Sequence, residues 1–225
     1  MKTSFAAWRL FCALVILGQS VTGVAARATT KGLNQIVTPD IQPKGQFSIS
    51  VQKQDPNVGN RLELQGELGL TNNFEVAVFD ATSPAVQVFN AEYGLYDKGP
   101  LLLSTGFLGW TTNGIAPQPF LEGGYYFKNL QLILGAERGP SQNAGDGSKP
   151  YNVYGTQAVT GIAYSPSSHL KLQVDYQSQD SNFATAGFTY AVTGSLSFNP
   201  AIYVTNSTPR KGYGYAVLTW TVTAF

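Results

Sequence analysis

Apolar and polar residues alternate with a period of two from Gln46 to the end of the 225-residue chain. Residues 47–51 read Phe-Ser-Ile-Ser-Val, and residues 170–176 read Leu-Lys-Leu-Gln-Val-Asp-Tyr. A period of two is that of a β-strand, because successive side chains of a strand point to opposite faces. The pattern therefore predicts a series of strands, each with one apolar and one polar face.

The alternating stretches occur in pairs, and short segments rich in Asn, Gly, Ser and Pro separate the members of each pair. Such segments favour tight turns, so each pair predicts an antiparallel hairpin. The turns are expected at residues 71–73, 96–99, 128–129, 165–168 and 193–194. Longer links are expected at residues 55–60, 81–85, 111–118, 139–152, 179–182 and 205–211. This predicts about twelve strands, and ten also fit because the alternation is weaker in residues 85–95 and 153–164.

Aromatic residues gather near both ends of the expected strands. The group beside the short turns comprises Phe74, Tyr93, Tyr125, Phe127, Tyr164 and Tyr190. The group toward the longer links comprises Trp110, Tyr154, Tyr176 and Tyr203. Two such bands are typical of transmembrane β-barrels, whose aromatic girdles lie at the two membrane–water interfaces.

The polar positions of the alternating strands hold few charged residues. Charged residues make up 12% of the chain, which is about half the share usual in a soluble domain. The polar positions hold Ser, Thr, Gln, Asn and Gly with scattered Glu, rather than the Lys and Glu of a solvent-exposed face. These features favour an antiparallel transmembrane β-barrel whose apolar face contacts lipid. The alternative is a secreted soluble β-barrel that binds a small apolar ligand.

The first 26 residues have the three parts of a secretory signal peptide. Lys2 and Arg9 are positively charged, residues 11–17 are apolar, and Val24-Ala25-Ala26 and Ala26-Arg27-Ala28 are small-residue cleavage motifs. Residues 27–45 follow with two prolines and no clear period. We interpret residues 27–45 as a flexible periplasmic leader, with a segment tucked into the barrel as the alternative. The barrel itself is expected to span residues 46–225.

The signal peptide, the repeated hairpins and the terminal Phe225 together resemble the small bacterial outer-membrane porins and channels. Residues 69–76 (Gly-Leu-Thr-Asn-Asn-Phe-Glu-Val) are similar to the G-L-T-x-x-Φ-E-Φ turn of barrel families linked to phenol degradation or transport. The resemblance implies the outer membrane of a Gram-negative bacterium, with short periplasmic turns and longer extracellular loops. It also implies that the barrel-assembly machinery reads the C-terminal strand that ends at Phe225.

If the apolar residues face lipid, the opposite parity lines the interior. The expected pore-lining residues are Glu63, Glu67, Glu75, Glu92, Glu122, Glu137, Lys171 and Asp175. Carboxylates around a lumen favour cations over anions. We therefore expect a porin-like channel for passive diffusion of small solutes that prefers cations. Twelve strands lie between barrels that side chains fill and barrels with open channels, so a non-conducting structural or binding scaffold is the alternative.

Other chemistries have little support. His169, the one histidine, follows Ser167 and Ser168 in an expected turn, where this sequence is ordinary turn chemistry, so no enzyme is expected. Cys12 is the one cysteine and lies in the signal peptide, so we expect no cofactor and no metal. The formal net charge of +1, without a basic patch, argues against nucleic acid. The expected partners are outer-membrane lipid and small solutes or ions.

Overall fold

The computed structural model describes residues 32–59, 61–82, 85–111, 117–140, 154–180 and 182–223. Twelve strands contain most of these residues. The strands are β1 (Gln46–Gln54), β2 (Leu62–Thr71), β3 (Phe74–Thr82), β4 (Ala85–Lys98), β5 (Leu101–Thr111), β6 (Gln118–Phe127), β7 (Leu130–Pro140), β8 (Tyr154–Ser167), β9 (Leu170–Gln177), β10 (Phe183–Ala191), β11 (Leu196–Thr205) and β12 (Gly212–Thr223). The predicted signal peptide, residues 27–31 and Phe225 lie outside the described residues.

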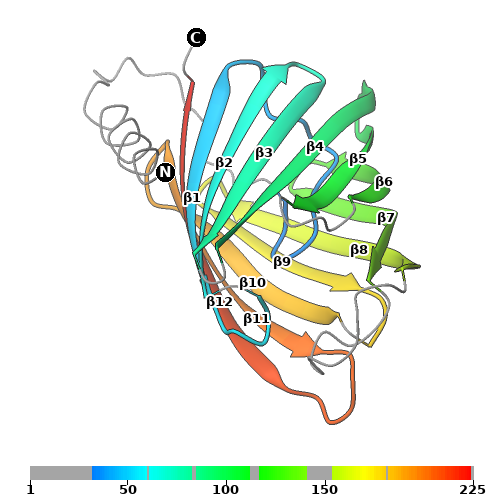
Figure 1. Cartoon of the computed structure of the whole chain (residues 1–225). Helices are drawn as coiled ribbons and strands as arrows, with labels where there is room; N and C mark the ends of the chain where they lie inside the picture. The colour runs from blue at the N-terminus through cyan, green and yellow to red at the C-terminus, as the bar shows by residue number, and fades with distance from the viewer. Residues whose placement is uncertain are drawn as a thin grey trace, which may run out of the picture.

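Each strand pairs antiparallel with its neighbours in sequence, and β1 pairs with β12, so the sheet closes into a barrel (Figure 1). The predicted antiparallel barrel of twelve strands is confirmed. At the closing seam, the side-chain oxygens of Ser48 and Thr221 lie 2.9 Å apart, and those of Ser50 and Thr219 lie 2.8 Å apart. All four side chains are buried, and each hydroxyl finds a hydrogen-bond partner across the seam.

The predicted alternation separates the two faces of the barrel. In β9, Leu172 and Val174 are 46% and 50% exposed on the outer face, whereas Gln173 and Asp175 are 2% and 1% exposed. Exposed apolar side chains recur on other strands, at Leu121, Leu132, Leu134, Ile162, Phe188, Ile202 and Leu218. A soluble barrel would place its apolar face inside, so this arrangement favours a barrel that lipid surrounds.

Most aromatic residues expected beside the short turns are exposed, as a membrane girdle requires: Tyr93, Tyr125, Phe127, Tyr164 and Tyr190. The prediction that Tyr203 belongs to the aromatic band toward the longer links is wrong, because this side chain is only 4% exposed and points inward. Tyr203 shares the parity of Asn199, which is fully buried, so the register of β11 places both on the inner face.

The connections differ in several places from those expected. β8 continues through Ser167, so the turn to β9 lies at residues 168–169 rather than 165–168. β4 continues through Lys98, and the turn to β5 lies at Gly99-Pro100, where Gly99 adopts a φ of 63° that glycine tolerates without strain. At the opposite end, β3 extends through Thr82 and β4 begins at Ala85, so the link between them is shorter than predicted.

Residues 32–45, which we name the inner segment, run along the inside of the barrel, and only Pro43 and Lys44, close to the start of β1, are exposed (Figure 1). Leu33, Asn34 and Ile36 are 3%, 3% and 5% exposed. For residues 32–42 the structure favours the alternative of a segment tucked into the barrel, because these residues find buried partners on the inner wall. Within the described ranges, no helix has the length and apolar character needed to cross a membrane.

Candidate functional site: an acidic cavity beside the inner segment

Asn34 anchors the inner segment to the barrel wall. Its backbone N–H donates to Asp175 Oδ2 on β9 at 2.7 Å, and its side-chain Nδ2 donates to Thr185 Oγ1 on β10 at 2.9 Å. Its Oδ1 accepts from Gln173 Nε2 at 2.8 Å, and the Tyr203 hydroxyl on β11 donates to its backbone oxygen. A typical hydrogen bond contributes about 1 kcal/mol, and a buried polar group left without a partner costs more. The position of Asn34 is therefore tightly specified.

Leu33 and Ile36 pack into an apolar patch on the inner wall. The patch consists of Ile133 on β7 with Val159 and Ala163 on β8, all at most 2% exposed. Full burial of a Leu or Ile side chain contributes about 1.5–3 kcal/mol. These three apolar residues of the inner face thus acquire their partners from the inner segment.

Glycines on the inner wall give the segment room to lie against it. A Cβ on Gly161 would lie 2.3 Å from Leu33 Cδ1, and one on Gly69 would lie 2.1 Å from the carbonyl oxygen of Pro43. Both distances are far shorter than packed atoms allow. The inner glycines that contact the segment in this way are Gly69, Gly94, Gly124, Gly161 and Gly187. They lie on β2, β4, β6, β8 and β10, so the segment is fitted to the wall along its length.

The second half of the inner segment is held by the first strands and by β6. The backbone N–H of Gln42 donates to Glu75 Oε2 at 2.6 Å, and its side-chain Nε2 donates to the backbone oxygen of Glu67 at 3.0 Å. The Tyr126 hydroxyl donates to Asp40 Oδ1 at 2.6 Å. Both halves of the segment therefore have polar anchors on the wall.

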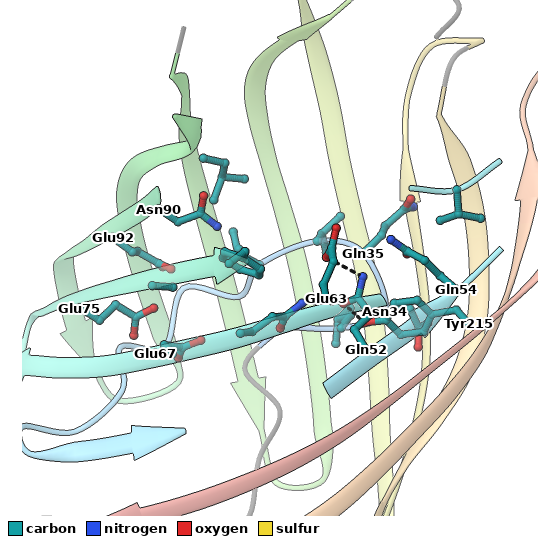
Figure 2. A pocket seen from close by; sticks show the side chains of 18 of the residues that line it. Asn34, Gln35, Gln52, Gln54, Glu63, Glu67, Glu75, Asn90, Glu92 and Tyr215 are labelled. Carbon is teal, nitrogen blue, oxygen red and sulfur yellow. Dashed lines mark hydrogen bonds between the residues drawn. The ribbon is translucent and has the colours of Figure 1, made fainter. Parts of the chain in front are cut away.

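A cavity of about 300 Å³ lies between the inner segment and the first strands of the barrel (Figure 2). Residues 33–37 of the inner segment line it. Strands β2–β4 contribute the carboxylates of Glu63, Glu67, Glu75 and Glu92. Amides and tyrosines complete the polar lining, from Gln52, Gln54, Gln65, Asn90, Tyr203 and Tyr215. Of the described residues that line the cavity, none is Lys or Arg. The cavity is thus acidic and rich in hydrogen-bonding groups.

Gln52 organises one end of this lining. Its Nε2 donates to Glu63 Oε2 at 3.1 Å, while its Oε1 accepts from Gln65 Nε2 at 2.6 Å and from the Tyr215 hydroxyl at 3.2 Å (Figure 2). The network connects β1, β2 and β12 across the seam. It holds the carboxylate of Glu63 in a defined orientation at the cavity.

All eight residues that the sequence analysis assigned to the interior lie on the inner face, but they form two groups. Glu63, Glu67, Glu75 and Glu92 line the cavity. Glu122, Glu137 and Asp175 are 1%, 7% and 1% exposed and are not part of the cavity lining. Asp175 binds the inner segment, Glu137 accepts a hydrogen bond from Gln177 Nε2, and Lys171 Nζ donates to the backbone oxygen of Gly32 at 3.4 Å. The second group therefore supports the wall and the segment, and a role in conduction stays a prediction.

Sequence reasoning missed the uncharged half of the site. Gln52, Gln65 and Tyr215 share the inward parity of the acids, so the alternation would have identified them. Asn34 precedes the alternating region and has no such signal. The one sequence signal for the inner segment was indirect. An inward apolar residue such as Val159 needs an apolar partner inside a polar lumen, and the inner segment supplies it.

Neither a metal centre nor a catalytic histidine emerges from the described part of the chain. No three His, Cys, Asp or Glu side chains there are close enough to hold a metal ion. His169 lies in the exposed turn between β8 and β9, where Ser168 Oγ is 3.0 Å from its Nδ1. This contact between sequence neighbours is typical of a turn.

Replacing Asn34 with leucine should release the inner segment without unfolding the barrel. Leucine has a similar volume but cannot bond Thr185 or Gln173, so buried polar groups lose their partners at a cost of about 2–3 kcal/mol. Amide hydrogen exchange in residues 33–45 should then accelerate on the order of 30-fold, since exchange there follows local opening. Exchange in the strands should be unchanged, and Gln87→Leu at an exposed site on β4 is the control. Equal exchange in residues 33–45 of both variants would show that Asn34 is no anchor.

Comparison with known proteins supports the fold alone. No family model matches the sequence, and no curated protein is similar to it. The solved structures that resemble this one include two porins. The KdgM porin in complex with disordered oligogalacturonate is 12% identical, with a TM-score of 0.52, over 78% of this chain and 98% of that one. The NanC porin is 8% identical, with a TM-score of 0.53, over 80% of this chain and 100% of that one. This chain thus has a porin-like fold, and the similarity of residues 69–76 to phenol-linked barrels stays a prediction.

Proposed function

We propose that this chain is an outer-membrane channel for passive diffusion of small solutes, and that it prefers cations to anions. The observation that carries the proposal is the acidic cavity inside a closed barrel whose outer face is apolar. Because the proposal assigns binding and passage of solutes to the site, it describes a channel and not an enzyme.

The outer face supports a location in the membrane. The strands contain 8 to 14 residues, and about 9–11 residues suffice to cross the hydrocarbon layer at a tilt. The middle of β7 presents Leu132 and Leu134, which are 42% and 69% exposed. Water would solvate such a belt poorly, whereas lipid tails match it. The signal peptide and recognition of the strand ending at Phe225 by the assembly machinery are part of the same proposal.

The inner face supports the preference for cations. Four carboxylates line the cavity without a lysine or arginine in the described lining. In a narrow passage with low-dielectric walls, such charges raise the local concentration of cations and exclude anions. The matched KdgM structure contains oligogalacturonate, which is an acidic sugar chain. The acidic cavity of this chain favours neutral or positively charged solutes instead.

Two alternatives receive less support. A soluble barrel that binds an apolar ligand requires an apolar interior, but this cavity has four carboxylates in its lining beside amides, tyrosines and apolar side chains. A non-conducting scaffold would fill its interior with side chains. The inner segment fills part of the interior, yet it leaves a cavity of about 300 Å³ beside it.

The direct test is a recording from the purified protein in a planar lipid bilayer that separates concentrated and dilute KCl. We expect discrete conductance steps and a reversal potential with the sign of selectivity for K⁺ over Cl⁻. Folding is checked on the same sample by a gel-mobility shift between unboiled and boiled protein. A folded barrel without conductance would favour the scaffold, and selectivity for Cl⁻ would contradict the role of the carboxylates.

A further inference from the structure

We propose, building on the channel function above, that the inner segment is a fixed constriction and that solutes pass between it and the acidic wall of β2–β4. The segment, whose residues precede the first strand, thereby determines the width of the passage. Val37 and Gln35, which line the cavity together with the carboxylates, would line the passage on the segment side.

The position of the cavity supports this path. The segment and the wall on β7–β9 are in close contact, because Leu33 and Ile36 fill the apolar patch and Asn34 bonds Asp175 and Gln173. Free volume remains on the other side, toward β1–β4. A barrel of twelve strands is wide enough to hold an extended segment and still leave space beside it.

The contacts of the segment support a fixed element rather than a movable one. Leu33 is buried in the apolar patch and packs against Gly161. Asn34 forms buried hydrogen bonds and packs against Gly187. Mobile loops have few buried contacts and weak local stability. The polar anchors at Asp40 and Gln42 hold the second half in addition. Conduction should therefore proceed with the segment in place.

Single cysteines provide the test in the full-length protein. The sequence has one cysteine, Cys12, in the predicted signal peptide, so the mature background should be free of thiols. Val37→Cys places a thiol at the cavity, and Ala163→Cys places one beneath the inner segment, where the native side chain is 1% exposed. Val174→Cys, on the outer face, is the matched control. Each open channel is treated with a positively charged and then, in separate recordings, a negatively charged methanethiosulfonate reagent.

We expect the reagent to lower the conductance of Val37→Cys by about two-fold or more, because added bulk narrows the passage. The cationic reagent should react several times faster than the anionic one. Ala163→Cys should stay unmodified by mass spectrometry, and Val174→Cys should conduct normally after treatment.

The outcomes separate this inference from the proposed function. If the unmodified protein conducts but Val37→Cys is unreactive, or is modified without a change in conductance, the passage lies elsewhere. If Ala163→Cys reacts as fast as Val37→Cys, the segment leaves the wall and is not fixed. If the native barrel is folded but never conducts, the channel function fails, and the constriction fails with it.

Discussion

Replacing Glu63, Glu67 and Glu92 together with glutamine should reduce the ratio of cation to anion permeability on the order of ten-fold at low salt, since each charge acts within a few ångströms of the passage. Glutamine keeps the size of glutamate and can still accept the hydrogen bond that Gln52 donates to Glu63. The barrel and the cavity should therefore persist while three charges disappear. Reversal potentials across a KCl gradient measure the ratio directly. Glu75 is left intact because it holds the backbone of Gln42.

A control with the same loss of charge separates the cavity from the protein as a whole. Asp80→Asn, Asp97→Asn and Asp180→Asn remove three carboxylates that are not part of the cavity lining, and none of the three is buried. This control should change the permeability ratio far less than the cavity variant, because salt screens distant exposed charges within about 10 Å at 0.1 M. The effect of both variants should weaken at high salt. Equal shifts in the two variants would show that overall charge, and not the acidic wall, determines selectivity.

Replacing Leu134 with arginine should destabilise the barrel in a lipid bilayer by about 2–4 kcal/mol, the cost of a basic side chain near the bilayer midplane. Leu134 is 69% exposed and pairs in register with Gly123 and Thr160, midway along β7. The free energy of unfolding is measured by urea titration of the protein folded into vesicles. Leu134→Phe, which keeps an apolar side chain at the same site, should change it little.

This variant distinguishes lipid from water at the outer face. On a soluble barrel, an exposed residue such as Leu134 would tolerate arginine within about 0.5 kcal/mol. A destabilisation of about 2–4 kcal/mol by Leu134→Arg, with little change for Leu134→Phe, therefore requires apolar surroundings at this site. If Leu134→Arg and Leu134→Phe had the same free energy of unfolding, the result would favour a secreted soluble barrel.

Local sequence patterns determined the strands and their faces. In β9, alternation from Lys171 to Tyr176 predicted which side chains lie inside, and the structure places Asp175 inside and Val174 outside. This works because a strand has a period of two wherever it lies, so the parity of a residue follows from its neighbours alone. The same argument places Tyr203 inside, because it shares the inward parity of Asn199 on β11. Its position near the end of the strand was a misleading guide.

The sequence by itself thus determined the barrel, a count of ten or twelve strands and the acidic character of the inner face, because each follows from residues that are close in the chain. Only the tertiary structure decided that residues 32–45 run along the inside of the barrel and that the acids form two groups. Asn34 meets Asp175 and Thr185 more than a hundred residues later, and no local pattern encodes such a contact. The division between Glu63 at the cavity and Glu122 in the wall follows from where the inner segment packs, because both residues have the same inward parity.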